Sequence, residues 1–364
     1  MSNEIIEIDG GFGEAGGQIL RTASSLSAIS RKPCHIFNIR KSRPKPGLAT
    51  QHLLGIQALN RLSQGKLEGD TLGSEEIRFY PNEIKAQHLN IKIETAGSIT
   101  LILQTLILPC LFAHSANSGQ AESPIKISFK GGATDTFFSP TIDHFRYVFL
   151  GILEKIIGKK IADIKIKKRG FYPEGGAEVE VEVYPLLRQG YGGQALKLKK
   201  INLTERDVFK KISLISGASE SLKAKRVAER QAASAREILG KLKLPTEEKI
   251  EYYNSQSSGS QINILAEFEK TIIGVDNLGK LGKSAEEVGK ETAENFLKEG
   301  ISNASLDKHS ADQILPFMAL STKRSQVSVS EITNHCKTNI WVIEKFLNGK
   351  FEINPVRKII QFNP

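Results

Sequence analysis

The pattern of hydrophobic and polar residues changes repeatedly between two periods along the chain. Segments with apolar residues every three to four positions predict helices, and they cover residues 18–29, 48–62, 97–114, 143–157, 220–239, 285–297, 310–320 and 339–347. Short alternating or β-branched segments predict strands, and they cover residues 4–9, 35–39, 76–80, 90–94, 125–130, 162–168, 177–184, 196–202, 261–275, 351–353 and 357–361. This alternation of strands and helices indicates a mixed α/β protein.

One order of elements, strand–helix–strand–helix–strand–strand, occurs twice before residue 184 with a period of about 80–90 residues, which indicates an internal duplication. A glycine-rich loop at 189–194 then interrupts the pattern, and a helix–strand–helix order resumes at 278. Residues 186–277 carry 16 Lys and Arg against 11 Asp and Glu. We therefore predict an α/β fold with α+β-like repeats: a large domain of residues 1–185 and 278–364, interrupted by a small basic α/β domain at 186–277.

Composition narrows the classes of protein. The chain has 364 residues, enough for two or three domains. Its three cysteines form no CxxC pair, which argues against a disulfide scaffold or a structural zinc site. The most apolar run, residues 99–113, is short and contains Thr, Gln and Pro, so no membrane span is expected. The first residues lack a secretory pattern, so we expect a cytoplasmic protein. The net charge of +10 favours polyanionic partners such as RNA, DNA or nucleotides.

The first candidate for chemistry is the glycine-rich turn at 10–17, directly before a predicted helix. Backbone N–H groups at a helix start bind anions, and glycines let a phosphate approach closely. No Gly-Lys-Ser/Thr sequence follows, so the turn is not a Walker A loop. Glu14 offers a carboxylate to a metal ion, and Arg21 lies one turn into the helix. The alternative interpretation is a tight turn that needs only the backbone freedom of glycine.

A second candidate follows the strand at 35–39. Four cations occur between Arg40 and Lys45, and Pro46 and Gly47 then lead into a helix that carries Gln51. Guanidinium groups held on a rigid loop suit phosphate recognition because they form two parallel hydrogen bonds. A solvated basic loop is the alternative.

A third candidate is His309, at the start of a predicted helix, with Asp312 one turn further on the same face. A histidine beside a carboxylate can act as a base, a ligand or a nucleophile. Helix capping is the alternative. The other histidines, His144 and His335 among them, show no pattern, and we expect them to be structural.

Two further segments have an aromatic or basic pattern. Phe137 and Phe138 lie in a polar loop and offer rings that stack on a base, or that cover the core. Lys223, Arg226 and Arg230 share one face of the helix predicted at 220–239, which suits a nucleic-acid backbone or plain solvation. Because every other segment with a chemical rationale lies outside 186–277, we expect that the insert is not the catalytic centre.

Together these segments resemble the RNA 3′-terminal phosphate cyclase family. The resemblance runs through nearly the whole chain in order, is weakest over the insert, and rests on the motifs at 8–21, 40–52, 130–135, 169–176 and 309–320. It implies three repeats of a two-helix, four-stranded unit plus an inserted smaller α/β domain. Ala15 and Ser42 stand where the family usually has glycine, and residues 137–140 lie where it packs against adenine.

The resemblance also implies an activity. Such an enzyme converts an RNA 3′-phosphate end to a 2′,3′-cyclic phosphodiester with ATP as co-substrate and Mg²⁺ or Mn²⁺ as the metal. It works through a histidinyl–AMP and an RNA–ppA intermediate, and it releases AMP and pyrophosphate. His309 matches the adenylylated histidine and Glu14 the metal-binding glutamate. The positions that match ATP- or phosphate-binding residues are Gln18, Arg21, Arg40, Arg43, Gln51 and Gln104.

Three other interpretations stay open at this point. The first is a non-catalytic cyclase-like protein of ribosome biogenesis, a relative that lacks the nucleophilic histidine. The second is an enolpyruvyl transferase, which is built from similar repeats but does not need the motif around His309. The third is a plain RNA-binding module. The presence of His309 favours an enzyme.

Overall fold

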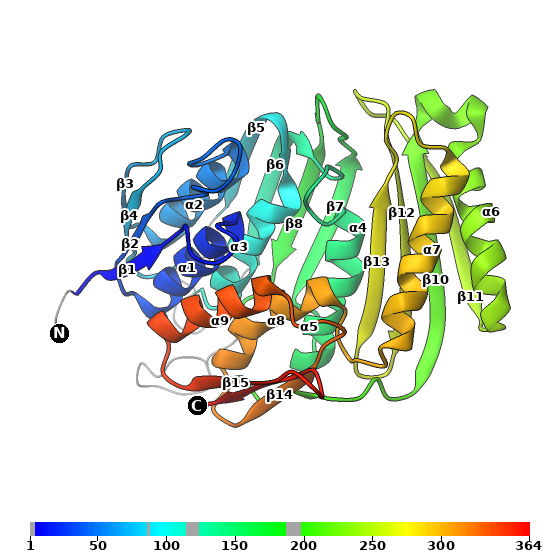
Figure 1. The fold of residues 1–364 in the computed structure, drawn as a ribbon. Coiled ribbons are helices and arrows are strands. Elements are labelled where there is room, and N and C mark those ends of the chain that lie inside the picture. The colour runs from blue at the N-terminus through cyan, green and yellow to red at the C-terminus, as the bar shows by residue number, and fades with distance from the viewer. Residues whose placement is uncertain (1–3, 86–87, 114–123, 187–197) are drawn as a thin grey trace.

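The computed structural model describes residues 4–85, 88–113, 124–186 and 198–364 (Figure 1). The glycine-rich loop predicted at 189–194 lies outside these residues. Within them the chain forms a mixed α/β fold with four four-stranded sheets. None of the described helices is both long enough and apolar enough to cross a membrane.

Three of the sheets share one strand order. The first sheet has the order β1(Ile6–Asp9)–β2(Cys34–Phe37)–β4(Ile77–Tyr80)–β3(Lys66–Glu68), the second β5(Leu89–Ser98)–β6(Ile125–Ala133)–β8(Glu178–Val183)–β7(Ala162–Lys168), and the third β9(Asn202–Leu203)–β14(Ser325–Ser328)–β16(Ile359–Asn363)–β15(Lys350–Asn354). In each of them the first pair of strands is parallel and the other two pairs are antiparallel.

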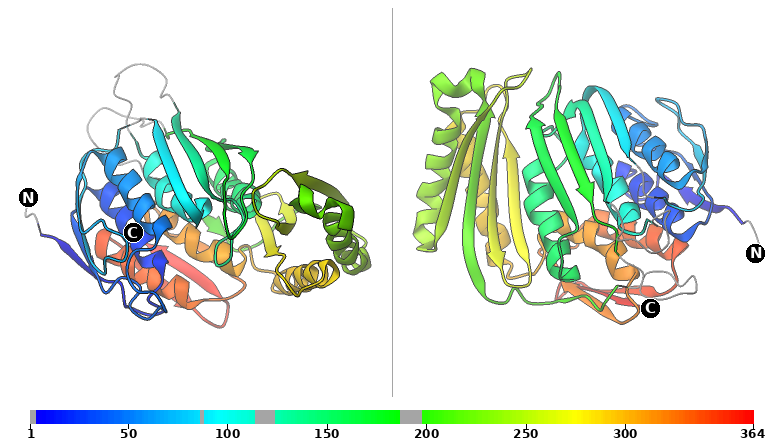
Figure 2. Two further views of the ribbon diagram at one scale, coloured as in Figure 1. Left: turned by 90° about the horizontal axis from the view of Figure 1, so that it is seen from above. Right: turned by 180° about the vertical axis from the view of Figure 1, so that it is seen from behind.

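Helices fill the space between these three sheets (Figure 2, left). They are α1(Gly17–Ser30), α2(Thr50–Ser63), α3(Ile99–Leu111), α4(Ile142–His144), a π-helical turn at Phe145–Phe149, α5(Leu150–Ile157), α8(Lys308–Ala319) and α9(Asn334–Phe346). Helices and sheets share one hydrophobic core, with fully buried side chains such as Ile19, Leu59, Ile102, Phe145 and Phe346. Helix α3 is buried on nearly every face, which explains its continuous apolar sequence.

The fourth sheet forms a separate packing unit (Figure 2, right). Its order is β11(Thr246–Tyr253)–β10(Phe209–Ser219)–β12(Ser260–Phe268)–β13(Ile272–Leu278), and α6(Val227–Leu239) and α7(Ala285–Ile301) pack against it. This unit has its own core, to which α7 contributes Val288, Ala293 and Phe296. The division of the chain at 185 and 277 remains a prediction, but this core extends beyond residue 277.

Sequence patterns missed some elements. Strands β3, β10, β11 and β14 were not predicted, and β11 is an edge strand whose first residues are polar and exposed. The helix predicted at 220–239 is interrupted, because Arg226 adopts a left-handed conformation between a 3₁₀ turn at Glu220–Lys225 and α6. The prediction that Lys223, Arg226 and Arg230 share one helix face is therefore wrong. Helix α9 begins at Asn334, five residues before the predicted start.

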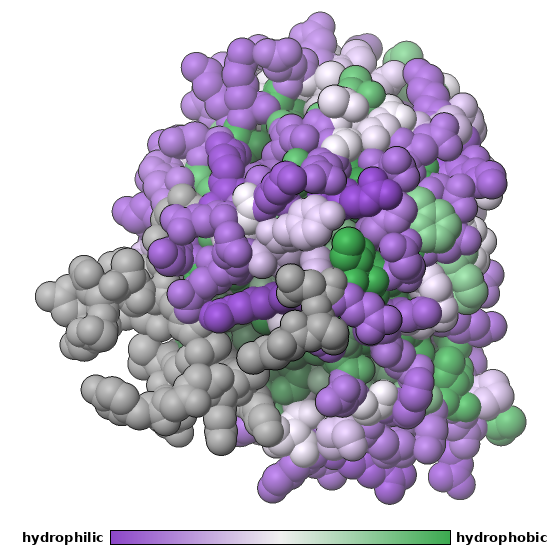
Figure 3. Space-filling view, turned by 90° about the vertical axis from the view of Figure 1, so that its left-hand side faces the viewer, coloured by the Kyte–Doolittle hydropathy of each residue, from purple (hydrophilic) through white to green (hydrophobic). Residues whose placement is uncertain are grey.

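The side of the molecule that carries the first sheet is mostly hydrophilic, and hydrophobic residues show there only as small patches (Figure 3). The described residues that Figure 3 shows on this side therefore form no broad apolar surface.

Candidate active site

The glycine-rich turn connects β1 to α1. Gly13 has φ +59° and Ala15 has φ +48°, so the chain turns through two left-handed residues before the helix. The Asp9 side chain accepts a hydrogen bond from the Gly11 backbone N–H at 2.8 Å, which ties the start of the turn to β1. Ala15 keeps this backbone conformation although the related family usually has glycine there. Glu14 between them is exposed at the surface of the turn.

Helix α9 holds this turn in register. The Glu14 carboxylate contacts His335 Nε2 at 2.8 Å, and the Phe12 ring stacks on the Trp341 indole with centroids 4.3 Å apart. Between these two contacts, a Cβ placed on Gly13 would lie 2.6 Å from Thr338 Oγ1. Three successive residues of the turn thus pack against one face of α9. Position 13 must be glycine, because any side chain there would collide with Thr338.

His309 is the second residue of α8. The Asp307 side chain caps the helix and accepts hydrogen bonds from the backbone N–H groups of His309, at 3.0 Å, and Ser310, at 2.8 Å. His309 reaches the surface, yet the surrounding protein removes enough water from the ring to lower its pKa below the ordinary value. The Asp307 carboxylate opposes this shift, and His144 adds to it. The imidazole is therefore neutral at neutral pH, the form that can act as a nucleophile.

Two residues near His309 were not predicted. His144 of α4 is buried, and neither of its ring nitrogens has a hydrogen-bond partner among the described residues. Asp276 of β13 lies close enough to raise the pKa of His309, and its carboxylate accepts a hydrogen bond from the Thr141 backbone N–H at 2.6 Å. Since Asp276 belongs to residues 186–277, the insert borders the candidate site. That the insert is not itself the catalytic centre remains a prediction.

Asp312, one helical turn after His309, connects α8 to the opposite side of the site. Burial raises the pKa of Asp312 to about 6, although His335 and Arg21 oppose the shift. The Asn339 amide donates to the Asp312 carboxylate at 3.3 Å and in turn accepts from Thr22 Oγ1 at 3.0 Å. This network joins α8 and α9 to α1.

Two of the three predicted glutamines, Gln18 and Gln104, line a small cavity with Arg21 and Asp312, between α1, α3, α8 and α9. Gln104 donates to Gln313 Oε1 at 3.0 Å, and Gln313 donates to the His309 backbone carbonyl at 2.8 Å. Gln18 is buried, and its Nε2 has no hydrogen-bond partner among the described residues. The structure thus brings Gln18, Arg21 and Gln104 together against α8 beyond His309, and Gln313 links them to the His309 backbone.

Arg21 and Arg40 supply positive charge beside the turn. Burial lowers the pKa of Arg21 to about 10, which leaves it charged at neutral pH. Arg40 donates to the Gly47 carbonyl at 2.8 Å. His52 Nε2 would lie 2.2 Å from a Cβ on Gly17, and burial together with the two arginines lowers the pKa of His52 to about 3. Arg21 and Arg40 therefore give this part of the site positive charge, and the buried Gln18 Nε2 and His52 Nδ1 have no hydrogen-bond partner among the described residues. Such a site fits a phosphate better than a cation.

The other predicted residues do not line the small cavity. Arg43 is exposed, and its backbone N–H donates to the Arg40 carbonyl at 2.9 Å. Gln51 Oε1 lies beside Gly97, where β5 leads into α3. Phe138 is fully exposed, and Phe137 packs on Tyr172 with centroids 6.2 Å apart. The adenine contact predicted for residues 137–140 remains a prediction.

Among the described residues no group of three or more His, Cys, Asp or Glu side chains is arranged to hold a metal ion. Glu14 can still fit Mg²⁺ or Mn²⁺, because Mg²⁺ in nucleotide sites usually takes one or two carboxylates and completes its shell with phosphate and water oxygens. Its carboxylate is exposed on the glycine-rich turn, which suits that arrangement.

Sequence reasoning missed His335, which was expected to be structural. Its only signal was helical spacing: His335, Thr338 and Trp341 fall on one face once the helix is known to begin at Asn334. That face has no chemical pattern of its own, because its partners are residues more than 300 positions earlier in the chain.

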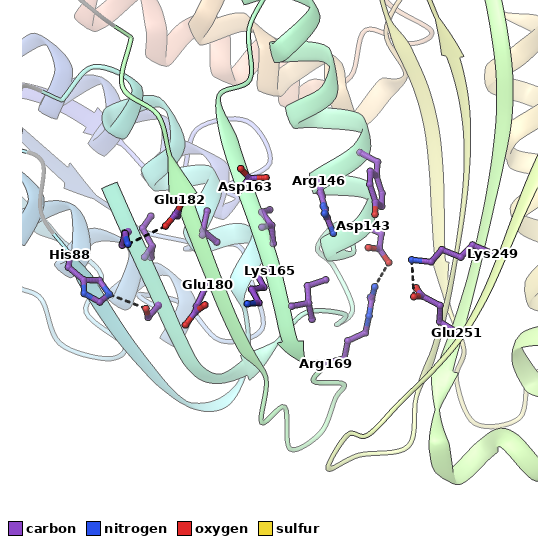
Figure 4. Close-up of a pocket in the computed structure, with 17 residues that line it drawn as sticks. His88, Asp143, Arg146, Asp163, Lys165, Arg169, Glu180, Glu182, Lys249 and Glu251 are labelled. Atoms are coloured by element: carbon purple, nitrogen blue, oxygen red, sulfur yellow. Dashed lines mark hydrogen bonds and ion pairs between the residues drawn. The ribbon is translucent and has the colours of Figure 1, made fainter. Parts of the chain in front are cut away.

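A larger groove, of about 900 Å³, lies between the second sheet and the insert (Figure 4). Its lining charges are largely paired with each other, as in the Lys126–Glu182 contact at 3.4 Å and the Lys249–Glu251 contact at 2.8 Å. None of the predicted site residues lines it. The candidate site is therefore the smaller cavity beside α8, whose lining residue Gln313 donates to the His309 backbone carbonyl.

Comparison with known proteins identifies the family. A model of RNA 3′-terminal phosphate cyclases matches residues 12–353. This chain belongs to that family. It is 42% identical to the RNA 3′-terminal phosphate cyclase of Pyrococcus abyssi over 96% of this chain and 95% of the relative. The Sulfurisphaera tokodaii cyclase is 43% identical over 98% of each chain, and that of Saccharolobus islandicus 42% over 97% of each.

Membership in the cyclase family limits the alternatives. The match spans both the motif around Glu14 and the motif around His309, which lie about 300 residues apart and meet at one site through α8 and α9. An enolpyruvyl transferase and an unrelated RNA-binding module are therefore set aside. The individual roles of the site residues belong to the proposal below.

Proposed function

We propose that this protein uses ATP to convert the 3′-phosphate end of an RNA to a 2′,3′-cyclic phosphodiester, through AMP bound covalently to His309. The observation that carries the proposal is a neutral imidazole at the start of α8, whose backbone carbonyl is linked through Gln313 to Gln104 in the cavity that Arg21 and Asp312 also line. The names of its relatives supply the substrate class.

In the first step, a ring nitrogen of His309 attacks the α-phosphorus of ATP. The N–P bond forms as the bond from that phosphorus to the bridging oxygen breaks, and pyrophosphate leaves. The imidazole gives up its remaining N–H proton to solvent or to a neighbouring base. Negative charge builds on phosphate oxygens, where Arg21 and Arg40 can stabilise it.

In the second step, an oxygen of the RNA 3′-phosphate attacks the same phosphorus, the N–P bond breaks, and His309 is released with a proton. The product is an RNA–ppA end. In the third step, the neighbouring 2′-hydroxyl attacks the 3′-phosphorus and loses its proton, and AMP leaves as the ring closes. The last step is intramolecular, so proximity lowers its barrier.

Glu14 is the residue that would hold a divalent ion, which neutralises phosphate charge when bound. His335 keeps the Glu14 carboxylate directed toward α8 by its contact at 2.8 Å. Gln18, Gln51 and Arg43 are proposed to contact ATP or the RNA phosphate.

The architecture is proposed to consist of three related units and an insert. The shared strand order of the first three sheets supports this proposal, as does their shared pattern of one parallel and two antiparallel pairs. A site between the first and third units then draws Glu14 from one and His309 from the other.

The proposal is tested with an RNA oligonucleotide that ends in a 3′-phosphate. We expect ATP-dependent formation of a 2′,3′-cyclic phosphate with one AMP released per end, and no product from a 3′-hydroxyl RNA. His309→Ala should abolish conversion while the protein stays folded by circular dichroism. If wild-type protein binds the RNA but forms no cyclic end with any divalent metal, the non-catalytic relative is the better interpretation.

A further inference from the structure

We propose that the Phe12–Trp341 pair is a binding site for a nucleobase near the 3′ end of the RNA. This inference rests on the proposed function, which places the RNA end at Glu14 and His309. The two rings are stacked, with centroids 4.3 Å apart and planes 15° apart. The Trp341 indole covers one face of Phe12, and Phe12 is still 41% exposed. An exposed aromatic face is what an unpaired base stacks on.

The position of the pair links it to the catalytic residues. Phe12 lies two residues from Glu14, whose carboxylate contacts His335 at 2.8 Å, and His335 Nδ1 lies 3.8 Å from Asp312. Asp312 is one helical turn from His309. The aromatic pair therefore lies at the outer end of a series of contacts that begins at Asp312, one helical turn from the proposed nucleophile.

The direction of α9 gives the order of the subsites. His335 and Trp341 are six residues apart on the helix, or ~9 Å along its axis. Lys345 lies one turn further and places its ammonium group 5.6 Å from the centre of the Trp341 indole. This surface therefore presents Glu14 and His335, then an aromatic ring, then a cation. A single-stranded RNA end presents a terminal phosphate, a base and a further phosphate within its last few nucleotides.

A structural role alone explains less of this arrangement. An aromatic residue that only filled the core would be buried, whereas Phe12 projects from the turn that holds the proposed metal ligand. The turn is already fixed to α9 by the Glu14–His335 contact and the close packing of Gly13 against Thr338. Phe12 is thus available to bind a ligand.

The test measures binding of a 5′-fluorescein RNA with a 3′-phosphate, without ATP, by anisotropy. We expect an abasic nucleotide at one of the last three positions to weaken binding to wild-type protein roughly tenfold, and substitution at the other two to have little effect. Phe12→Leu should weaken binding of the intact RNA by a similar factor and should lose most of its sensitivity to that abasic position. Equal affinity for all three abasic RNAs and the intact RNA would overturn the proposal.

Two controls separate this inference from the proposed function. Phe351 also packs on an aromatic ring, that of Phe362, but on the third sheet, so Phe351→Leu should leave RNA affinity unchanged. Labelling by α-labelled ATP reports on His309 without RNA, so loss of that label contradicts the proposed function and leaves the RNA-binding test valid.

Trp341 is the only tryptophan, so saturating RNA should change its emission. Unchanged emission would also overturn the inference.

Discussion

At the scale of single residues, the protonation of His309 decides whether it can act as a nucleophile. Burial lowers its pKa and Asp307 raises it. The neutral, reactive ring therefore persists below pH 6.5, the ordinary pKa of histidine. We predict that the single-turnover rate of self-adenylylation falls on the acid side with a midpoint below pH 6.5. A midpoint at or above pH 6.5 would contradict this assignment.

Two variants identify the titrating group in that profile. Asp307→Asn keeps an oxygen acceptor for the helix cap but removes the charge, so the midpoint should move further down. Asp312 has a pKa raised to about 6 and also titrates in this range. Asp312→Asn removes that contribution, and a midpoint that remains in this variant belongs to His309.

Glu14 supports a second prediction at this scale. Glu14→Ala should slow self-adenylylation about tenfold or more at low Mg²⁺ or Mn²⁺, because the ion loses its protein ligand. Higher metal concentration should restore part of the rate. Glu7→Ala is a matched control, since Glu7 is also an exposed carboxylate that contacts a histidine, His35, at 2.8 Å. If both variants keep the wild-type rate at every metal concentration, Glu14 only holds the turn.

At the scale of elements, helix α9 positions the glycine-rich turn. A side chain at position 13 meets two penalties, a φ of +59° and a contact of 2.6 Å with Thr338. Gly13→Ala should therefore lower the melting temperature and slow self-adenylylation by about tenfold. Gly282→Ala introduces a similar positive φ with no atom nearby, so it should lower stability by about 1 kcal/mol without slowing adenylylation. Equal effects of the two variants on adenylylation would show that the register with α9 is unimportant.

The same scale shows what the sequence could and could not predict. Periodicity located most helices, and β7 was predicted with its observed bounds, because one face of each element packs on the core. Strand β11 was missed, because its first residues are exposed at the edge of its sheet. Local motifs singled out Glu14, Arg21 and His309 as candidates, and their roles remain predictions. His335, His144 and Asp276 were not singled out, because their place beside these residues depends on contacts between distant segments.

At the scale of the whole molecule, the insert both borders the site and carries much of the positive charge. Asp276 influences His309, whereas Lys223, Arg226 and Arg230 lie at the far side of the insert sheet. Arg230 is already paired with Glu286 of α7 at 2.7 Å. We predict that neutralising the three cations leaves self-adenylylation within about twofold of wild type, because these groups are surface charges with weak local effects.

RNA binding should respond differently to the same triple variant. If these cations contact the RNA backbone, the KM for RNA rises and its salt dependence becomes flatter, since fewer counterions are released. Neutralising Lys66, Lys92 and Lys350, which are exposed on the first, second and third sheets, is the charge-matched control. A folded insert variant that cannot form the enzyme–AMP adduct would show that α6 helps to build the ATP site.

The most direct test of the account is the identity of the adenylylated residue. Incubation with α-labelled ATP and Mg²⁺ or Mn²⁺ should leave one AMP per protein, bound by a linkage that is labile to acid and stable to alkali, as a phosphoramidate on histidine requires. The label should map to the peptide that contains His309 and should disappear in His309→Ala. Stable label in His309→Ala, or label on another residue of the wild-type protein, would contradict the proposed mechanism.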